Sequence, residues 1–198
     1  MMAAEGTADA RAPAGPGAGA FAGGGEMGLL LRERDWTGTV LGPIDLWPQS
    51  LRTAVGLLLE TPVAMVLLWG DTGVMLYNDG YSEIAADRHP ELFGAEVRAG
   101  WGEISDFNDH VMRVVLAGDT LSYRDKELVL HRRGRDESAW FDLDYSPVRD
   151  ESGRPAGVLA VVRETTGRVM AELHAAAEFD RLQRLFQQAP TFMAMLRG

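Results

Sequence analysis

Residues 140–166 read WFDLDYSPVRDESGRPAGVLAVVRETT, and this stretch decides the fold. In its first part Phe141, Leu143 and Tyr145 alternate with polar or mixed residues, a period of two that predicts a β-strand with one apolar face. The run DESG at 150–153 is a hairpin signal. We therefore expect antiparallel strands over 139–148 and 157–164.

Three further strands are expected on the N-terminal side of this hairpin. Residues 121–131 alternate in the same way, and Arg133-Gly134 supplies the turn into the next strand. Residues 63–69, VAMVLLW, form a short apolar run between Pro and Gly, which favours a buried strand over a helix. The turn at 70–73 leads from that run into a strand over 74–77.

Helical periodicity marks the segments around these strands. Apolar residues recur at helical spacing over 26–34. They recur again in a second helix, which Ser50 can cap and which runs to about Glu60, and in a third over 104–116. Between the first two helices, residues 35–48 hold two Pro, two Gly and two Trp. Pro and Gly break helices while Trp needs burial, so this segment is predicted to be a rigid packed loop.

A last helix is predicted over 168–187. Its apolar residues follow steps of four, three, three, three and four, close to the seam of a coiled coil. Such a narrow stripe needs a partner helix in order to be buried, so it predicts self-association. The apolar positions are Val169, Leu173, Ala176, Phe179, Leu182 and Phe186.

Charge and composition exclude several classes of function. The 198 residues carry 19 Lys+Arg against 29 Asp+Glu, a formal net charge of −10. Nucleic acids and anionic membranes are bound through clustered Lys and Arg, so we expect neither as a partner. The absence of Cys removes disulfides, thiolate metal sites and thiol catalysis, and it fits a cytoplasmic protein. The apolar runs are all shorter than the length that crosses a bilayer.

Four segments resemble the N-terminal PAS region of bacterial sensor histidine kinases. They are DWTGTVLGPIDLWPQSLRTAV at 35–55, WG at 69–70 followed by LYNDGYSEI at 76–84, RHPELFG at 88–94, and WFDLDYSPVRDESGRPAGVLAVVRETTGRV at 140–169. The resemblance extends over residues 26–172. It implies an α+β PAS fold, in which an antiparallel five-stranded sheet carries short helices on one face, with an N-terminal helical flank and a coiled-coil-like exit helix.

Composition and the resemblance together divide the chain. Residues 1–25 are mostly Ala, Gly and Pro, which predicts a disordered tail. The helical flank then covers 26–61, the PAS core 62–166 and the signalling helix 167–188. Residues 189–198 resemble the start of a second PAS repeat.

The resemblance implies a sensory module rather than an enzyme. Such a module senses a signal in its pocket or through dimerisation, and transmits it through the exit helix to a downstream kinase in two-component phosphorelay signalling. The implied partners are a second copy, bound through the flank and the exit helix, and downstream PAS and kinase domains in the same chain. The alternative is a ligand-free PAS scaffold that serves only for dimerisation and spacing.

The resemblance also implies two groups of functional residues. Glu164 and Thr166 stand where PAS families place an Asp-x-Thr motif for signal transfer, with Glu in place of the usual Asp, although a plain helix cap would use the same residue types. The pocket would be lined by apolar and aromatic residues plus Asn78, all of which could equally be core or local structure. The pocket candidates are Met65, Leu67, Trp69, Tyr77, Asn78, Tyr81, Trp101, Phe107, Val111, Val115, Phe141, Leu143, Tyr145, Leu159 and Val161.

No cofactor is assigned from the sequence. The photochemistry of light-oxygen-voltage domains needs a Cys beside the flavin, so the absence of Cys excludes a cysteinyl-flavin photoadduct. Haem is not expected, because Phe107 rather than His110 falls at the axial-ligand position of haem-binding PAS domains. No metal site is expected, and Asp142 and Asp144, which share one side of a strand, lack the surroundings that acid-base catalysis needs.

Overall fold

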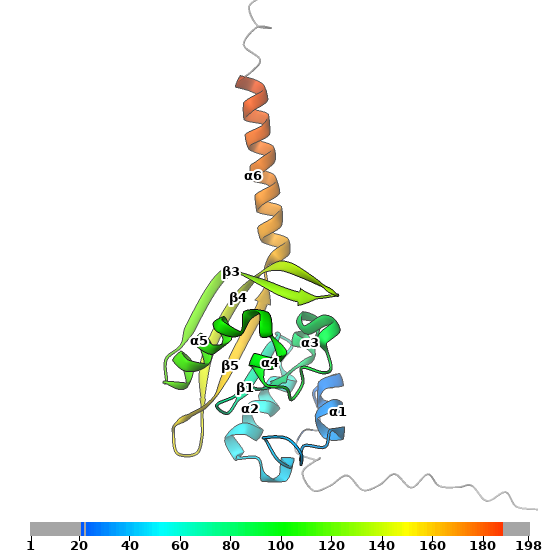
Figure 1. Ribbon diagram of the computed structural model, residues 1–198, viewed down its shortest axis with the longest axis vertical. Helices are drawn as coiled ribbons and strands as arrows, with labels where there is room; N and C mark the ends of the chain where they lie inside the picture. Colours follow the sequence, from blue (N-terminus) through cyan, green and yellow to red (C-terminus); the bar gives the residue numbers. More distant parts are fainter. Residues whose placement is uncertain (1–20, 22, 188–198) are drawn as a thin grey trace, which may run out of the picture.

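A single antiparallel sheet forms the centre of the molecule, as the computed structural model shows for the residues that it describes, 21 and 23–187. Its strand order is β2-β1-β5-β4-β3 (Figure 1). The predicted α+β PAS fold with five strands is confirmed. The strands are β1 (Met65–Trp69), β2 (Val74–Tyr77), β3 (Leu121–Arg132), β4 (Arg135–Arg149) and β5 (Pro155–Glu164).

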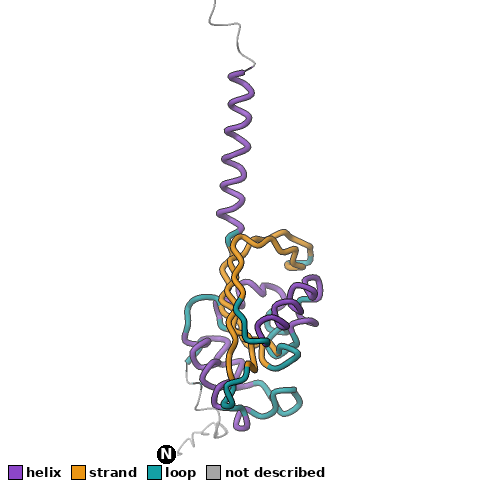
Figure 2. The backbone as a smooth tube through the Cα atoms, turned by 90° about the vertical axis from the view of Figure 1, so that its left-hand side faces the viewer, coloured by secondary structure: helices purple, strands orange, loops and turns teal. Residues whose placement is uncertain are grey.

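Helices lie on both sides of this sheet, seen edge-on in Figure 2. The short helices between β2 and β3 cover one face, and the flank helix α2 packs against β1 and β2 from the other. The exit helix α6 projects away from the sheet. The α-helices are α1 (Gly25–Glu33), α2 (Gln49–Glu60), α3 (Asp79–Ala85), α4 (Val97–Gly100), α5 (Ser105–Leu116) and α6 (Thr166–Gln187), and the short 3-10 helices are η2 (Ile44–Leu46), η3 (Ala86–Arg88) and η4 (Gly102–Ile104).

The flank belongs to the same hydrophobic core as the sheet. Trp36 and Trp47 of the predicted packed loop are both buried, with ring centroids 5.3 Å apart, and the Trp36 ring meets Phe93 edge-on. Leu51 and Leu58 bury the inner side of α2. The flank is therefore a structural layer of the domain.

Two local predictions need correction. Ser50 does not cap α2, because the helix begins at Gln49 with Pro48 in the capping position, and both the backbone N–H and the hydroxyl of Ser50 donate to the Glu151 carboxylate. The predicted tail also ends earlier than residue 25, because Phe21 is buried against Trp47. The rest of that tail, apart from residues 23–25, and the predicted repeat at 189–198 lie outside the described residues.

Within the described ranges, every helix is either too short or too polar to cross a lipid bilayer.

Candidate functional site

A small cavity lies between the sheet and the helices α3, α4 and α5. Its free volume is about 50 Å³, whereas typical ligand pockets measure roughly 300 to 1,000 Å³. Its walls are apolar side chains from all five strands, together with residues of the helices that cover this face of the sheet. Six of the predicted pocket residues line it, namely Tyr81, Trp101, Phe107, Phe141, Leu143 and Tyr145.

The predicted strand positions of β1 and β5 lie on the opposite face of the sheet. Val66 pairs with Ala160, and both line the cavity, so the alternate pair formed by Leu67 and Leu159 faces α2. The predicted pocket residues of β1 and β5 were therefore wrong by one position, because their neighbours in the chain line the cavity. The residues displaced to the α2 face are Met65, Leu67, Trp69, Leu159 and Val161.

Three other candidates are core residues beside the cavity. Tyr77 is fully buried, with its ring centroid 5.2 Å from those of Tyr81 and Phe93. Val111 and Val115 are fully buried on α5 without lining the cavity. These side chains pack in the core around the cavity without lining it.

Asn78, the best polar candidate from the sequence, is engaged by the backbone. Its Oδ1 accepts from the Met65 N–H at 3.0 Å and from the Tyr81 N–H at 3.1 Å, which caps α3. Its Nδ2 donates to the carbonyl oxygens of Thr61 and Val63, each at 2.7 Å. This side chain therefore ties the start of β1 to α3 and lies outside the cavity lining.

The polar groups at the cavity are instead two tyrosines, a tryptophan and Asn108. The Trp101 Nε1–H donates to the Tyr81 hydroxyl oxygen at 3.1 Å. Burial raises the pKa of Tyr81 to about 12 and also raises the pKa of Tyr145, so both keep their protons near neutral pH. Asn108 was missed from the sequence, although its spacing of three and seven residues from Val111 and Val115 places it on the apolar face of its helix.

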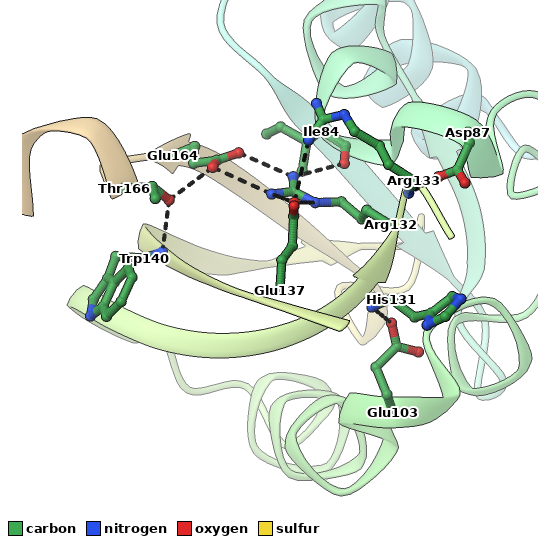
Figure 3. A network of polar contacts seen from close by, with 10 residues as sticks. All are labelled: Ile84, Asp87, Glu103, His131, Arg132, Arg133, Glu137, Trp140, Glu164 and Thr166. Atoms are coloured by element: carbon green, nitrogen blue, oxygen red, sulfur yellow. Dashed lines mark hydrogen bonds and ion pairs between the residues drawn. The ribbon is translucent and has the colours of Figure 1, made fainter. Parts of the chain in front are cut away.

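A second candidate site joins β3, β5 and the start of α6, and its centre is the buried Arg132 (Figure 3). Its guanidinium donates to both oxygens of Glu164, at 3.1 and 3.3 Å, and to Glu137 at 2.7 Å. One of its N–H groups also donates to the Ile84 carbonyl oxygen at 3.1 Å. The Arg132 side chain thus connects the end of β5, the β3–β4 hairpin and α3.

Glu164 and Thr166, the predicted signal-transfer residues, both belong to this network. The Thr166 hydroxyl donates to Glu164 Oε1 at 2.8 Å and accepts from the Trp140 N–H at 3.0 Å. Burial by itself raises the pKa of Glu164, but the hydrogen bonds from Arg132 and Thr166 outweigh it and hold that pKa below its usual value. The first turn of α6 is thereby fixed to the sheet by charged and neutral hydrogen bonds.

Asp125 makes a second connection between the sheet and α6. It lies at an irregularity of the β3–β4 pairing with a φ of 48°, and its carboxylate accepts from the Thr165 hydroxyl at 2.8 Å and from Arg168. These hydrogen bonds, that of Arg168 first, hold the pKa of Asp125 below its usual value. The start of α6 is therefore hydrogen-bonded to both strands of the β3–β4 hairpin, to β3 through Asp125 and to β4 through Trp140.

The remaining chemical candidates lie outside the cavity. His110 is exposed on α5, with its Nδ1 2.9 Å from an Arg113 nitrogen, whereas Phe107 lines the cavity. Asp142 accepts from the Asp125 N–H, and Asp144 accepts from Ser122 and Arg124 on the other side of the sheet from the cavity. Within residues 21 and 23–187, no group of three or more His, Asp and Glu side chains is arranged to hold a metal ion.

The chain is similar to known proteins in this fold. The sequence model of the PAS fold family matches residues 58–170. An RNA-binding light-oxygen-voltage receptor matches with 18% identity and a TM-score of 0.45, over 73% of this chain and 40% of that one. The PAS domain of Bordetella pertussis BvgS matches with 18% identity and a TM-score of 0.46, over 65% of this chain and 96% of that one.

A sensory box sensor histidine kinase from Vibrio cholerae matches with 18% identity and a TM-score of 0.40, over 59% of this chain and 92% of that one. This chain thus spans 40% of the length of the light-oxygen-voltage receptor. Likenesses of this size carry no information on function. No curated protein matches the sequence.

Proposed function

The chain belongs to the PAS family, and from this premise we propose that it is a sensory and regulatory module of a histidine kinase, which transmits a signal through α6 to domains that follow in the same protein. We further propose that it works in the cytoplasm as a homodimer, as part of two-component phosphorelay signalling. The chain itself supplies regulation, and the enzymatic activity belongs to the downstream kinase.

The observation that carries this proposal is the joint formed by Arg132, Glu164 and Thr166. Glu164 is the last residue of the central strand β5 and Thr166 the first of α6, so a movement at this end of the sheet acts directly on the helix. Arg132 extends the joint to the α3 carbonyl of Ile84, which lines the cavity. A change in the cavity can therefore reach α6 through two hydrogen-bonded side chains.

The surface of α6 supports an assembly with a second copy. The helix has 22 residues, a length of about 33 Å, and none of them is buried. Its exposed apolar side chains are left uncovered by the described residues of one protomer, because the helix projects away from the sheet (Figure 1). They are Met170, Leu173, Phe179, Leu182, Leu185 and Phe186.

Dimerisation through α6 can be measured by sedimentation. We expect the 198-residue chain to sediment as a dimer at high micromolar concentration, and the double variant Phe179→Glu and Leu182→Glu to sediment as a monomer, because like charges would face each other across the seam. Gln183→Glu is the control, since it adds one negative charge, half of the change in the double variant, at a polar position of the same helix turn. A wild-type chain that remains monomeric would contradict dimerisation through α6.

Signal transfer can be tested in the full-length protein by inserting residues between Ala176 and Ala177. One inserted alanine rotates everything that follows by about 100° relative to the PAS core. Autophosphorylation of the kinase is expected to change several-fold, whereas a seven-residue insertion, which restores the seam, is expected to leave it nearly unchanged. Unchanged kinase activity with the single insertion would refute transmission through this helix.

A ligand-free scaffold for dimerisation and spacing is the second candidate function. The observation that favours it is the small cavity volume of about 50 Å³, which leaves no room for a flavin or haem. In that case α6 and the flank would still dimerise, while the cavity contents would not affect kinase output.

A further inference from the structure

The free edges of the two outer strands, β2 and β3, are covered differently. Along β2, the Met75 N–H donates to the Ala95 carbonyl oxygen at 2.9 Å, and the Met75 carbonyl oxygen accepts from the Gly94 N–H at 2.7 Å. The strand β3 lies at the other edge of the sheet, and no described strand pairs with its outer side (Figure 1). Unpaired N–H and C=O groups on an edge strand are a template for pairing with another chain.

The turn into β4 determines which backbone groups of β3 point outward. The two-residue turn at 133–134 has positive φ values of 56° and 72°, so Arg132 forms a hydrogen-bonded pair with the residue opposite it on β4. Hydrogen-bonded and non-hydrogen-bonded pairs alternate along an antiparallel ladder. The N–H and C=O groups of Glu127, Val129 and His131 therefore face away from β4 and towards the edge.

Side chains cover only part of this edge. The His131 N–H donates to Glu103 Oε1 at 2.7 Å, which closes the end next to the turn (Figure 3). The backbone groups of Glu127 and Val129 make no hydrogen bond with any described residue. Residues 126–130 thus form an open window with two donors and two acceptors, which have the spacing that an antiparallel strand needs.

A surface cleft lies directly beside this window. It has a volume of about 350 Å³, runs between the start of α5 and β3, and has Ile104, Phe107 and Leu128 as its half-buried apolar lining. Val129 borders the same cleft at 49% exposure, and it is the one exposed large apolar side chain on the described strands. Alternate side chains of an added strand would point into the cleft, where burial of apolar surface stabilises the contact.

The charges at the cleft favour a basic partner. Glu103, Asp106 and Glu127 line it, against Lys126 as the single basic residue of the lining. Glu103 is already paired with Arg88, at 3.0 Å, so the other two carboxylates are left to a partner. Opposite charges across an interface speed the encounter and select the partner, whereas an acidic segment would be repelled.

We propose that residues 126–130 of β3 bind an extended segment of a partner protein as a sixth strand, antiparallel to β3, in which basic and apolar side chains alternate. The basic side chains lie on the outer face of the sheet beside Glu127, and the apolar ones point into the cleft beside Leu128. Binding of such a segment does not depend on the proposed role of α6. The competing explanation is that Lys126 and the pairing irregularity at Asp125 keep this edge unpaired.

The test uses a seven-residue peptide of alternating Lys and Val with blocked ends. It is titrated into the 15N-labelled 198-residue chain and followed by NMR. Saturable binding with a Kd of about 1 mM or lower is expected from four neutral hydrogen bonds and the cleft contacts. Hydrogen exchange of the Glu127 and Val129 amides should slow by about tenfold or more at saturation. The Leu128 amide, which already faces β4, should change little.

Two N-methylated forms of the peptide separate backbone pairing from charge attraction. In the proposed register the Lys N–H groups face β3, and the Val N–H groups face solvent. Methylation of the Lys amides should therefore weaken binding by about tenfold or more, because two donors to β3 are lost. Methylation of the Val amides should leave binding nearly unchanged, although both forms carry the same charge.

Substitutions in the chain assign the peptide to β3. Glu127→Lys reverses a charge beside the window and should weaken binding about fivefold. Glu33→Lys makes the same change on the exposed side of α1, so it is the control and should have a smaller effect. Val129→Pro removes an outward N–H without taking a hydrogen bond from the β3–β4 ladder, and a loss of about fivefold is expected. If Val129→Pro does not fold, the comparison of Glu127→Lys with Glu33→Lys decides.

Three results would overturn the proposal: no saturable binding at millimolar concentrations of the peptide, equal binding of both methylated forms, or equal effects of Glu127→Lys and Glu33→Lys. Slow exchange of the Glu127 and Val129 amides that increases with the concentration of the chain alone would overturn it as well, because it would place a second copy at this edge. The sedimentation and insertion experiments on α6 are independent of all these outcomes.

Discussion

Arg132→Met is expected to lower the free energy of unfolding by about 3 kcal/mol, near the lower end of the range for breaking a buried ion pair. The guanidinium is 3% exposed and makes four hydrogen bonds, so its removal takes away one donor from the Ile84 carbonyl oxygen and the buried positive charge that pairs with the two carboxylates. Glu137 and Glu164, at 18% and 34% exposure, regain some water, which limits the loss. Urea unfolding at neutral pH measures the effect.

Arg133→Met is the matched control for this substitution. Its side chain is 60% exposed and reaches Glu137 only at 3.4 Å, so the expected change is within about 0.5 kcal/mol. Arg132→Lys keeps a charge but loses the planar fork, and an intermediate loss is expected. Equal stability of Arg132→Met and Arg133→Met would contradict a stabilising role for the network.

The same comparison has a defined pH dependence. The folded-state pKa of Glu164 is lowered, so its contribution to stability is complete above its unfolded-state pKa of about 4.3 and is lost as the pH falls through the folded-state value. The stability difference between wild type and Arg132→Met should therefore narrow between pH 7 and pH 3. A difference that stays constant over this range would show that the ion pair with Glu164 is not its source.

Trp36→Ala is expected to cost about 3 to 5 kcal/mol, the range for deleting a large aromatic side chain from a core. Trp36 is 2% exposed, and its ring lies between Trp47, at 5.3 Å, and Phe93, at 5.7 Å, with the Arg34 guanidinium 5.2 Å from its centroid. Its Nε1–H also donates to the Leu31 carbonyl oxygen at 2.9 Å. Thermal and urea unfolding measure the loss.

Two further variants serve as controls for the Trp36→Ala measurement. Trp36→Phe keeps an aromatic ring and should lose less, and it replaces the alanine variant if the latter does not fold. Leu46→Ala lies in the same flank at 76% exposure and should have almost no effect. A loss below about 1 kcal/mol for Trp36→Ala would mean that the flank is separable from the sheet.

Most of the secondary structure follows from local patterns in the sequence. The strand over 74–77 has the predicted bounds, and the last three strands lie within a few residues of theirs, because the alternation of apolar residues is clear and turn residues mark both hairpins. The exit helix begins at Thr166, two residues before its predicted start. These patterns depend on residues that are close together in the chain, so they can be recognised without knowledge of the rest of the fold.

The site depended on contacts between distant segments. Arg132 reads from the sequence as one of several charged residues near an exposed turn, yet α3, β4 and β5 enclose it and supply its partners. Asn108 could have been found from its place on an apolar helix face, but the lack of a partner is visible only once the surrounding helices and strands are in place.

The sequence by itself determined the strands, the hairpins, the exit helix and the PAS resemblance, since each rests on periodicity or on a motif. Only the tertiary structure decided which side of β1 faces the cavity. The run MVLLW of β1 is apolar at every position because α2 covers one face of this strand and the cavity side is also buried. A strand buried on both faces has no alternation, so its orientation is fixed by pairing with β5 and by packing.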